Sequence, residues 1–141
     1  MSEYVIKQLS IFINNEPGRL ANIASVLKEC NINMKAFNIA ESSGFGVLRA
    51  IVDNPEKAYK DLKDKNIIVK ITEVLAIPMI DKPGGLFEVA KVIGNAGINI
   101  EYGYAYTGKA CSAFFFRVDD VCSAVKAMKS ANLKVLKESE I

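Results

Sequence analysis

The sequence contains no histidine among its 141 residues. Histidine is the commonest general base and a frequent metal ligand, and no Ser/Lys dyad, phosphate loop or carboxylate cluster replaces it. The cysteines, Cys30, Cys111 and Cys122, are odd in number and lack CxxC spacing, which argues against disulfide and zinc roles. We expect them to be small buried hydrophobic residues. The sequence therefore predicts no catalytic residues, no metal site and no cofactor.

Long apolar runs are also missing. No stretch approaches the ~18–20 residues of a membrane span, and the N-terminus MSEYVIKQLS has none of the regions of a signal peptide. The net charge is +2, with lysines mixed among acidic residues, whereas a dedicated nucleic-acid-binding protein usually carries a basic stripe. Half of the residues are hydrophobic, which is ordinary for a globular protein with a buried core. We therefore expect a cytoplasmic protein that binds neither membranes nor nucleic acid.

The sequence repeats itself when it is shifted by 66 residues, without any gap. An ungapped match of this length indicates a tandem duplication, which fixes the architecture. The clearest matches are Pro17-Gly18 with Pro83-Gly84, Ile32-Asn33 with Ile98-Asn99, and Val52-Asp53 with Val118-Asp119.

Hydrophobic periodicity predicts the same order of elements in both copies. Apolar residues alternate along the first strand (Leu9, Ile11, Ile13), and the first helix places Leu20, Ile23, Ala24 and Leu27 on one face. The first copy is predicted to hold a strand at 4–13, a helix at 18–30, strands from 33 to about 40 and at 45–52, a helix from 54 to about 65 that buries Ala58 and Leu62, and a strand at 67–71. The second copy repeats them as strand 74–80, helix 84–96, strands 98–106 and 111–118, helix 119–131 and strand 133–137.

This order is βαββαβ twice, the ferredoxin-like plan. We predict an α+β protein with two such units in tandem, residues 1–72 and 73–141, each an antiparallel sheet with helices on one face. The other face of each sheet must be covered by another sheet, a subunit or a ligand. Almost no linker is present, because residues 67–80 lead from the last strand of the first copy into the first strand of the second. Pro78 lies near the end of that strand, and because it lacks an N–H we expect a bulge there.

The segment around Phe12 has two interpretations. Phe12 and Phe45 fall on the strands that carry stacking aromatic residues in RNA-recognition modules. The second copy has Pro78 and Cys111 at these positions, so a stacking platform is not repeated. We therefore expect Phe12 to be a core residue and predict no sequence-selective RNA binding.

Both copies share another feature, a loop in which Asn or Asp is followed by one residue and then by Pro-Gly at the start of a helix. Asn15 corresponds to Asp81. Proline fixes φ, and glycine lets a guest approach the backbone. The start of the helix offers unpaired N–H groups and a positive dipole end, which suit a carboxylate, and the side-chain oxygen of Asn15 or Asp81 can accept hydrogen bonds from an ammonium group. An ordinary helix start after a turn is the alternative.

The segments PGRLANIASVLKECNINM and PGGLFEVAKVIGNAGINI resemble the first-helix signature of ACT domains, regulatory modules that bind amino acids. The resemblance covers nearly the whole chain. It implies ferredoxin-like folds that pair side by side, with an amino acid bound where the loop of one domain meets the second strand of its neighbour. The binding residues that it implies are Asn15, Glu16, Pro17, Gly18, Arg19, Leu20 and Asn33 in the first copy, and Asp81, Lys82, Pro83, Gly84, Gly85, Leu86 and Asn99 in the second.

The two loops differ at the position that the family commonly fills with an acidic residue. The second copy keeps Asp81, whereas the first has Asn15, and we therefore expect the second loop to be the better site. With two ACT domains and no enzyme attached, the resemblance implies a homodimeric, non-enzymatic regulatory protein whose output is ligand binding itself or an effect on a separate enzyme. The alternative is an assembly subunit that binds no ligand.

Overall fold

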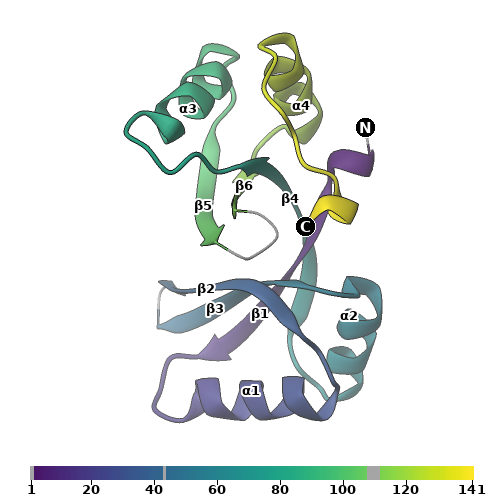
Figure 1. The fold of residues 1–141 in the computed structure, drawn as a ribbon. Coiled ribbons are helices and arrows are strands. Elements are labelled where there is room, and N and C mark those ends of the chain that lie inside the picture. The colour runs from purple at the N-terminus through teal and green to yellow at the C-terminus, as the bar shows by residue number, and fades with distance from the viewer. Residues whose placement is uncertain (1, 43, 108–111) are drawn as a thin grey trace. The chain divides into compact units, whose positions relative to one another are not determined.

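The computed structural model describes residues 2–42, 44–107 and 112–141, which form two compact units (Figure 1). The N-terminal unit comprises residues 7–72. The C-terminal unit comprises residues 73–141 together with the short segment that precedes residue 7. In that segment, Tyr4 lies under the ammonium group of Lys129, 4.0 Å from the ring centroid, and its hydroxyl accepts a hydrogen bond from the same group. The first residues are thus attached to the C-terminal unit.

The N-terminal unit is an antiparallel sheet with two helices on one face, in the order β2-β3-β1-β4. In the register of its strands, Leu48 lies opposite both Ile11 and Ile39. The start of β4 completes this sheet, and the rest of β4 carries the chain into the C-terminal unit. A 3-10 turn, η1 (Ser2–Tyr4), precedes the elements, which are β1 (Ile6–Asn14), α1 (Arg19–Glu29), β2 (Met34–Ser42), β3 (Phe45–Val52), α2 (Pro55–Asp64) and β4 (Val69–Pro78).

The C-terminal unit repeats this plan with the strand order β4-β6-β5. Both strand pairs are antiparallel, with Phe116 opposite Leu75 and Gly103. Helices α3 and α4 lie together on one side of these strands (Figure 1). The elements after β4 are α3 (Gly85–Asn95), β5 (Ile100–Thr107), β6 (Ser112–Val118), α4 (Val121–Ser130) and a final 3-10 turn, η2 (Glu138–Glu140).

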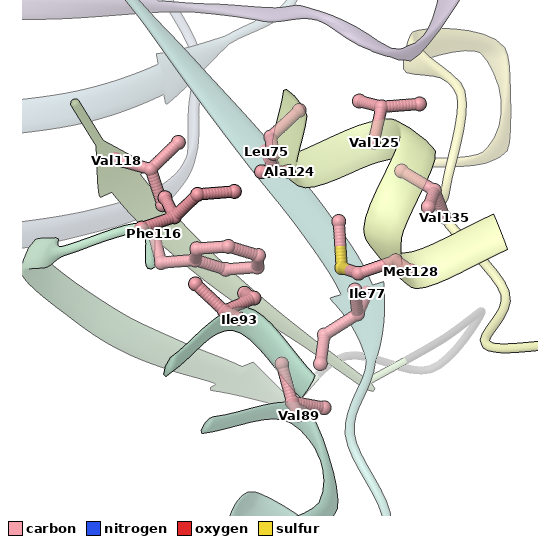
Figure 2. Close-up of a cluster of buried hydrophobic side chains, with 11 residues drawn as sticks. Leu75, Ile77, Val89, Ile93, Phe116, Val118, Ala124, Val125, Met128 and Val135 are labelled. Carbon is pink, nitrogen blue, oxygen red and sulfur yellow. The ribbon is translucent and has the colours of Figure 1, made fainter. Parts of the chain in front are cut away.

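The core of each unit lies between its sheet and its helices. In the C-terminal unit, the ring of Phe116 lies among side chains from β4, α3 and α4, including Leu75, Ile93 and Met128 (Figure 2). The N-terminal core holds Leu9, Leu27 and Leu62 at the matching positions of the repeat. The two cores are thus built from the same positions of the repeat. This confirms the predicted fold class, two ferredoxin-like units with helices on one face.

Each of the helices ends in the same way, with a residue in the left-handed conformation just after its last turn. These residues are Asn31, Asn66, Gly97 and Asn132, with φ between 56° and 75°. The next residue is apolar and donates its N–H five positions back, as from Ile32 to Leu27, which satisfies the last carbonyl groups of the helix. Glycine and asparagine tolerate this φ better than other residues do, so an Asn or Gly followed by Ile or Leu marks each helix exit in the sequence.

Several predictions about single elements were wrong. Residues 133–137 are not a strand: the N–H of Leu136 donates to the carbonyl of Ala76 at 2.8 Å, but within the described chain no ladder develops from this bond. Pro78 lies at the last position of β4 in regular register with Ala113. The neighbouring Met79 donates the next bond to β6, from its N–H to the carbonyl of Ser112 at 3.0 Å, so the missing N–H of Pro78 leaves the register intact and no bulge is required.

Some side chains predicted to be buried are not. Leu20 is 46% exposed and Ala24 is exposed, because α1 turns only the face of Ile23 and Leu27 toward the sheet. Phe12 is half-buried and lies outside the core, since it points away from the helix side of β1. Cys30 is half-buried and Cys122 is exposed, both as free thiols, and Cys111 lies outside the described residues.

Candidate functional site at the Pro-Gly loops

The two Pro-Gly loops have the same backbone conformation. Gly18 and Gly84 are left-handed, with φ of 87° and 90°, and each stands at the N-cap of its helix. The N–H of Glu16 donates to the carbonyl of Asn14 at 3.0 Å, and the matching bond joins Lys82 to Ile80 at 2.9 Å. The repetition seen in the sequence is therefore also a repetition of loop geometry.

Both loops leave the start of the following helix without a side-chain cap. Helices α2 and α4 begin at Asn54 and Asp120, whose side-chain oxygens accept hydrogen bonds from the N–H groups of Lys57 and Ser123. The bonds from the Ser123 hydroxyl and N–H also lower the pKa of the Asp120 carboxyl. Helices α1 and α3 have glycine at this place, and no described side chain caps them. The N–H groups of the first helical residues, Arg19 and Gly85, donate to the carbonyls of Glu16 and Lys82. The N–H groups that follow in the first turn remain able to bind an anionic group.

The side chains around these open helix starts differ between the units. In the N-terminal loop, Glu16 and Arg19 form an ion pair with 2.7 Å between Oε1 and Nε. The C-terminal loop has Lys82 and Gly85 at these positions, so it has no such pair. Asp81 is exposed and makes no hydrogen bond or ion pair that joins it to another described residue. The loop before α3 therefore carries an accessible carboxylate.

Asn33 and Asn99 do not lie beside the loops of their own units. The Pro-Gly loop follows Asn14, which pairs with Phe45, whereas Asn33 precedes Met34, which pairs with Val52 at the other end of β3. At about 3.3 Å per strand residue, these ends are roughly 23 Å apart. Within one unit, the structure thus separates the two parts of the predicted site.

Both asparagines have a structural partner that the prediction missed. The Asn33 amide lies 3.5 Å from Oδ1 of Asp53, and the N–H of Asn99 donates to Oδ1 of Asp119 at 3.2 Å. The repeated Val-Asp steps were visible in the sequence, and they mark these contacts at the start of the second strand. The contact explains an asparagine at position 33, where the side-chain amide is used, but not at position 99, where only the backbone N–H takes part.

The two glycines of the C-terminal loop have different roles. A Cβ on Gly84 would meet no atom within 4 Å, and its positive φ is what requires glycine. A Cβ on Gly85 would lie 2.4 Å from the carbonyl oxygen of Ile80, closer than real Cβ atoms approach. Gly85 therefore keeps the loop packed against the end of β4, and Gly84 leaves open space in front of the helix.

We expect Gly85→Ala to lower the free energy of unfolding by about 1–3 kcal/mol, because the added methyl group forces the loop away from Ile80. Gly94→Ala is the matched control in the same helix, where the added methyl group meets no atom within 4 Å. It should raise the free energy of unfolding by about 0.5–1 kcal/mol. Urea denaturation of both variants measures the difference, and equal stabilities would contradict the contact assigned to Gly85.

Each loop borders a hollow within its own unit. In the N-terminal unit it measures about 260 Å³ and lies between the end of β1, the start of α1 and residues 66–68. In the C-terminal unit it measures about 270 Å³ and lies between the end of β4, the start of α3 and residues 133–134. The sequence did not predict these hollows, which arise at corresponding positions of the repeat.

Within the described residues, no group of three or more metal-binding side chains comes together, and no helix is long and apolar enough to cross a membrane. The rings of Phe12 and Phe45 do lie together, with centroids 6.4 Å apart. Phe45 is 40% exposed, but Pro78 stands at the position of Phe12 in the second copy, so this aromatic pair is not repeated.

The fold and the repeated loop define a class of protein: paired ferredoxin-like modules, each with an uncapped helix start after a Pro-Gly turn. The sequence matches the model of the ACT domain pair over residues 4–141. The chain therefore belongs to the ACT domain pair family.

Solved structures share this fold. A protein from Bacteroides thetaiotaomicron is 38% identical, and the match covers 97% of this chain and 95% of that chain with a TM-score of 0.88. The ligand-free regulatory subunit of aspartate kinase from Thermus thermophilus is 15% identical, with coverage of 92% and 95% and a TM-score of 0.63. The corresponding subunit from Thermus flavus is also 15% identical, with coverage of 90% and 94% and a TM-score of 0.58. No protein with a curated description matches the sequence.

Proposed function

We propose that the protein is a regulatory amino-acid-binding protein and that the loop Asp81–Leu86 is its principal site. The observation that carries the proposal is the uncapped start of α3 beside the accessible carboxylate of Asp81. The N–H groups of the helix start would bind the carboxylate of the ligand, and Asp81 would accept hydrogen bonds from its ammonium group. Asn15–Leu20 would form a second, weaker site, because Asn15 is neutral.

The family supports a regulatory role, and the aspartate kinase subunits of similar fold are named as regulatory. We propose that the chain likewise acts without catalysis of its own and passes its signal to a separate enzyme in the cytoplasm. Asn33 and Asn99 would contribute to a site only across a domain interface, because each lies far from the loop of its own unit.

A thermal-shift screen with the twenty amino acids tests this proposal. A ligand that binds only the folded protein stabilises it by about 2.7 kcal/mol when its concentration is a hundred times its Kd. For units of this size, such a stabilisation raises Tm by several degrees. We expect one amino acid, or a chemically related group, to do so in a saturable way. If none of the twenty raises Tm, the alternative of an assembly subunit without ligand is favoured.

We propose that the chain forms a homodimer through the outer strand β2. Phe37 and Ile39 are 56% and 45% exposed on the helix side of this strand, which lies at the edge of its sheet. Exposed apolar side chains beside unpaired backbone groups favour association.

We expect light scattering to show a dimer at tens of micromolar. The double variant Phe37→Asp/Ile39→Asp should weaken dimerisation by more than about tenfold, since each buried side chain of this size contributes about 1.5–3 kcal/mol. Ile68→Asp, at a residue that is 71% exposed away from β2, is the control and should leave the dimer intact. A monomeric wild type at these concentrations would refute the proposal.

A further inference from the structure

The hollow of the C-terminal unit has an apolar wall. Pro78 and Ile80 come from the end of β4 and the residues after it, Val89 from α3, and Leu133 from the segment after α4. Three charged residues, Lys82, Glu88 and Lys134, lie at its border. A volume of about 270 Å³ is at the lower end of the range for small-molecule pockets. It suits a side chain or a similarly small apolar group.

The corresponding hollow of the N-terminal unit is more polar. Arg19 and Asn22 line it at the positions that Gly85 and Glu88 occupy in the C-terminal unit, and Asn14 replaces Ile80. The absence of a side chain at Gly85 leaves the C-terminal hollow unobstructed next to the Pro-Gly turn. The two hollows therefore share a position but not a chemistry.

Exposed apolar residues gather around the C-terminal loop as well. Ile80, Leu86 and Phe87 are 54%, 49% and 61% exposed, and the ring of Phe87 lies 5.7 Å from the ammonium group of Lys91. In the N-terminal unit, Leu20 is the apolar counterpart of Leu86, while Asn14 and Ala21 correspond to the other two. Of these three side chains, Ile80 lines the hollow and is available to a ligand there.

We propose that the C-terminal site selects amino acids with a large apolar side chain, which enters the hollow and packs against Ile80, Val89 and Leu133. This inference rests on the proposed function, because it assumes that the ligand backbone binds at Asp81 and the start of α3. The bordering charges of Lys82, Glu88 and Lys134 would remain in water. A side chain of the size of leucine or phenylalanine removes apolar surface of both partners from water, whereas alanine reaches little of the hollow.

Calorimetry of the full chain with leucine, phenylalanine and alanine tests the inference. Because each additional buried carbon of the ligand strengthens binding several-fold, we expect leucine or phenylalanine to bind about ten- to a hundredfold more tightly than alanine. Alanine binding as tightly as both, with binding still sensitive to Asp81→Ala, would overturn the inference and leave the proposed function intact. No binding of any amino acid would overturn both.

A matched pair of variants tests whether the C-terminal hollow determines which amino acid binds. Glu88→Trp brings a large ring to the border of the C-terminal hollow and should weaken leucine binding at least tenfold while alanine binding changes little. Asn22→Trp makes the same change in the N-terminal unit and should leave leucine affinity within about twofold. Equal losses in both variants, or a loss in Asn22→Trp alone, would show that the C-terminal hollow is not the selective one.

Both variants are checked by their unfolding midpoints without ligand. If Glu88→Trp unfolds at a lower temperature, Ile80→Ala provides a second test, because this side chain lines the hollow, is 54% exposed and contributes little to the core. It should weaken leucine binding about threefold or more and leave alanine binding unchanged. Unchanged leucine affinity in Ile80→Ala would then contradict the inference.

Discussion

Asp81→Ala is expected to weaken binding of the best amino acid ligand by roughly ten- to a hundredfold while leaving the fold intact. A charge-assisted hydrogen bond between the ligand ammonium group and a carboxylate contributes about 1.5–3 kcal/mol. Asp81 is exposed and makes no hydrogen bond or ion pair to the rest of the described chain, so its removal should not disturb the loop. Isothermal titration calorimetry measures the affinity, and circular dichroism checks the fold.

Two further variants make this prediction specific. Asp81→Asn keeps an oxygen acceptor but removes the charge. Its affinity for the ligand should therefore lie between the affinities of the wild type and Asp81→Ala. Asn15→Ala changes the equivalent position of the N-terminal loop and should have a smaller effect if the C-terminal loop is the principal site. Equal losses would mean that both loops bind, and unchanged affinity in Asp81→Ala would place the site elsewhere.

Phe116→Ala is expected to lower the free energy of unfolding by about 3–5 kcal/mol, the usual range for removing a buried ring. Phe116 is 0% exposed and lies in the C-terminal core (Figure 2). Its ring also stacks on Phe114, with centroids 5.2 Å apart. Phe87→Ala is the control with the same chemical change at an exposed position, and should alter stability by less than about 0.5 kcal/mol.

Chemical denaturation of the two phenylalanine variants measures both values. The C-terminal loop connects β4 and α3, and this core holds those two elements together. Partial unfolding of the C-terminal unit in Phe116→Ala should therefore also weaken ligand binding. Figure 2 shows the Phe116 ring among the core side chains. If Phe116→Ala lowered the free energy of unfolding by less than about 1 kcal/mol, the stability of this core would not depend on the ring.

Much of the fold could be predicted from the sequence because the repeat is ungapped. The 66-residue shift brings Leu9 onto Leu75 and Leu62 onto Met128, and these pairs occupy equivalent places in the two cores. The segment 133–137 could not be predicted correctly, since its apolar residues resemble those of the matching strand in the first copy. Whether such a segment becomes a strand depends on its backbone partners, which periodicity does not determine.

The candidate site was only partly predictable. The open helix starts follow from Pro-Gly and from the lack of a capping side chain, both of which are local features. The partners of Asn33 and Asn99 are Asp53 and Asp119, twenty residues away in sequence, and only tertiary structure brings them together. The role of Gly85 likewise depends on the carbonyl of Ile80, five residues before it and beyond any local turn rule.

The central claim, that an amino acid binds at the C-terminal Pro-Gly loop, is tested most directly by nuclear magnetic resonance of the isotope-labelled chain. The best ligand from the thermal-shift screen is titrated in, and the backbone amide signals are followed. The account predicts saturable shifts that are largest at Gly84, Gly85 and Leu86, with smaller shifts at the N-terminal loop. Saturable shifts that leave these three amides unchanged, or no saturable shift with any of the twenty amino acids, would contradict it.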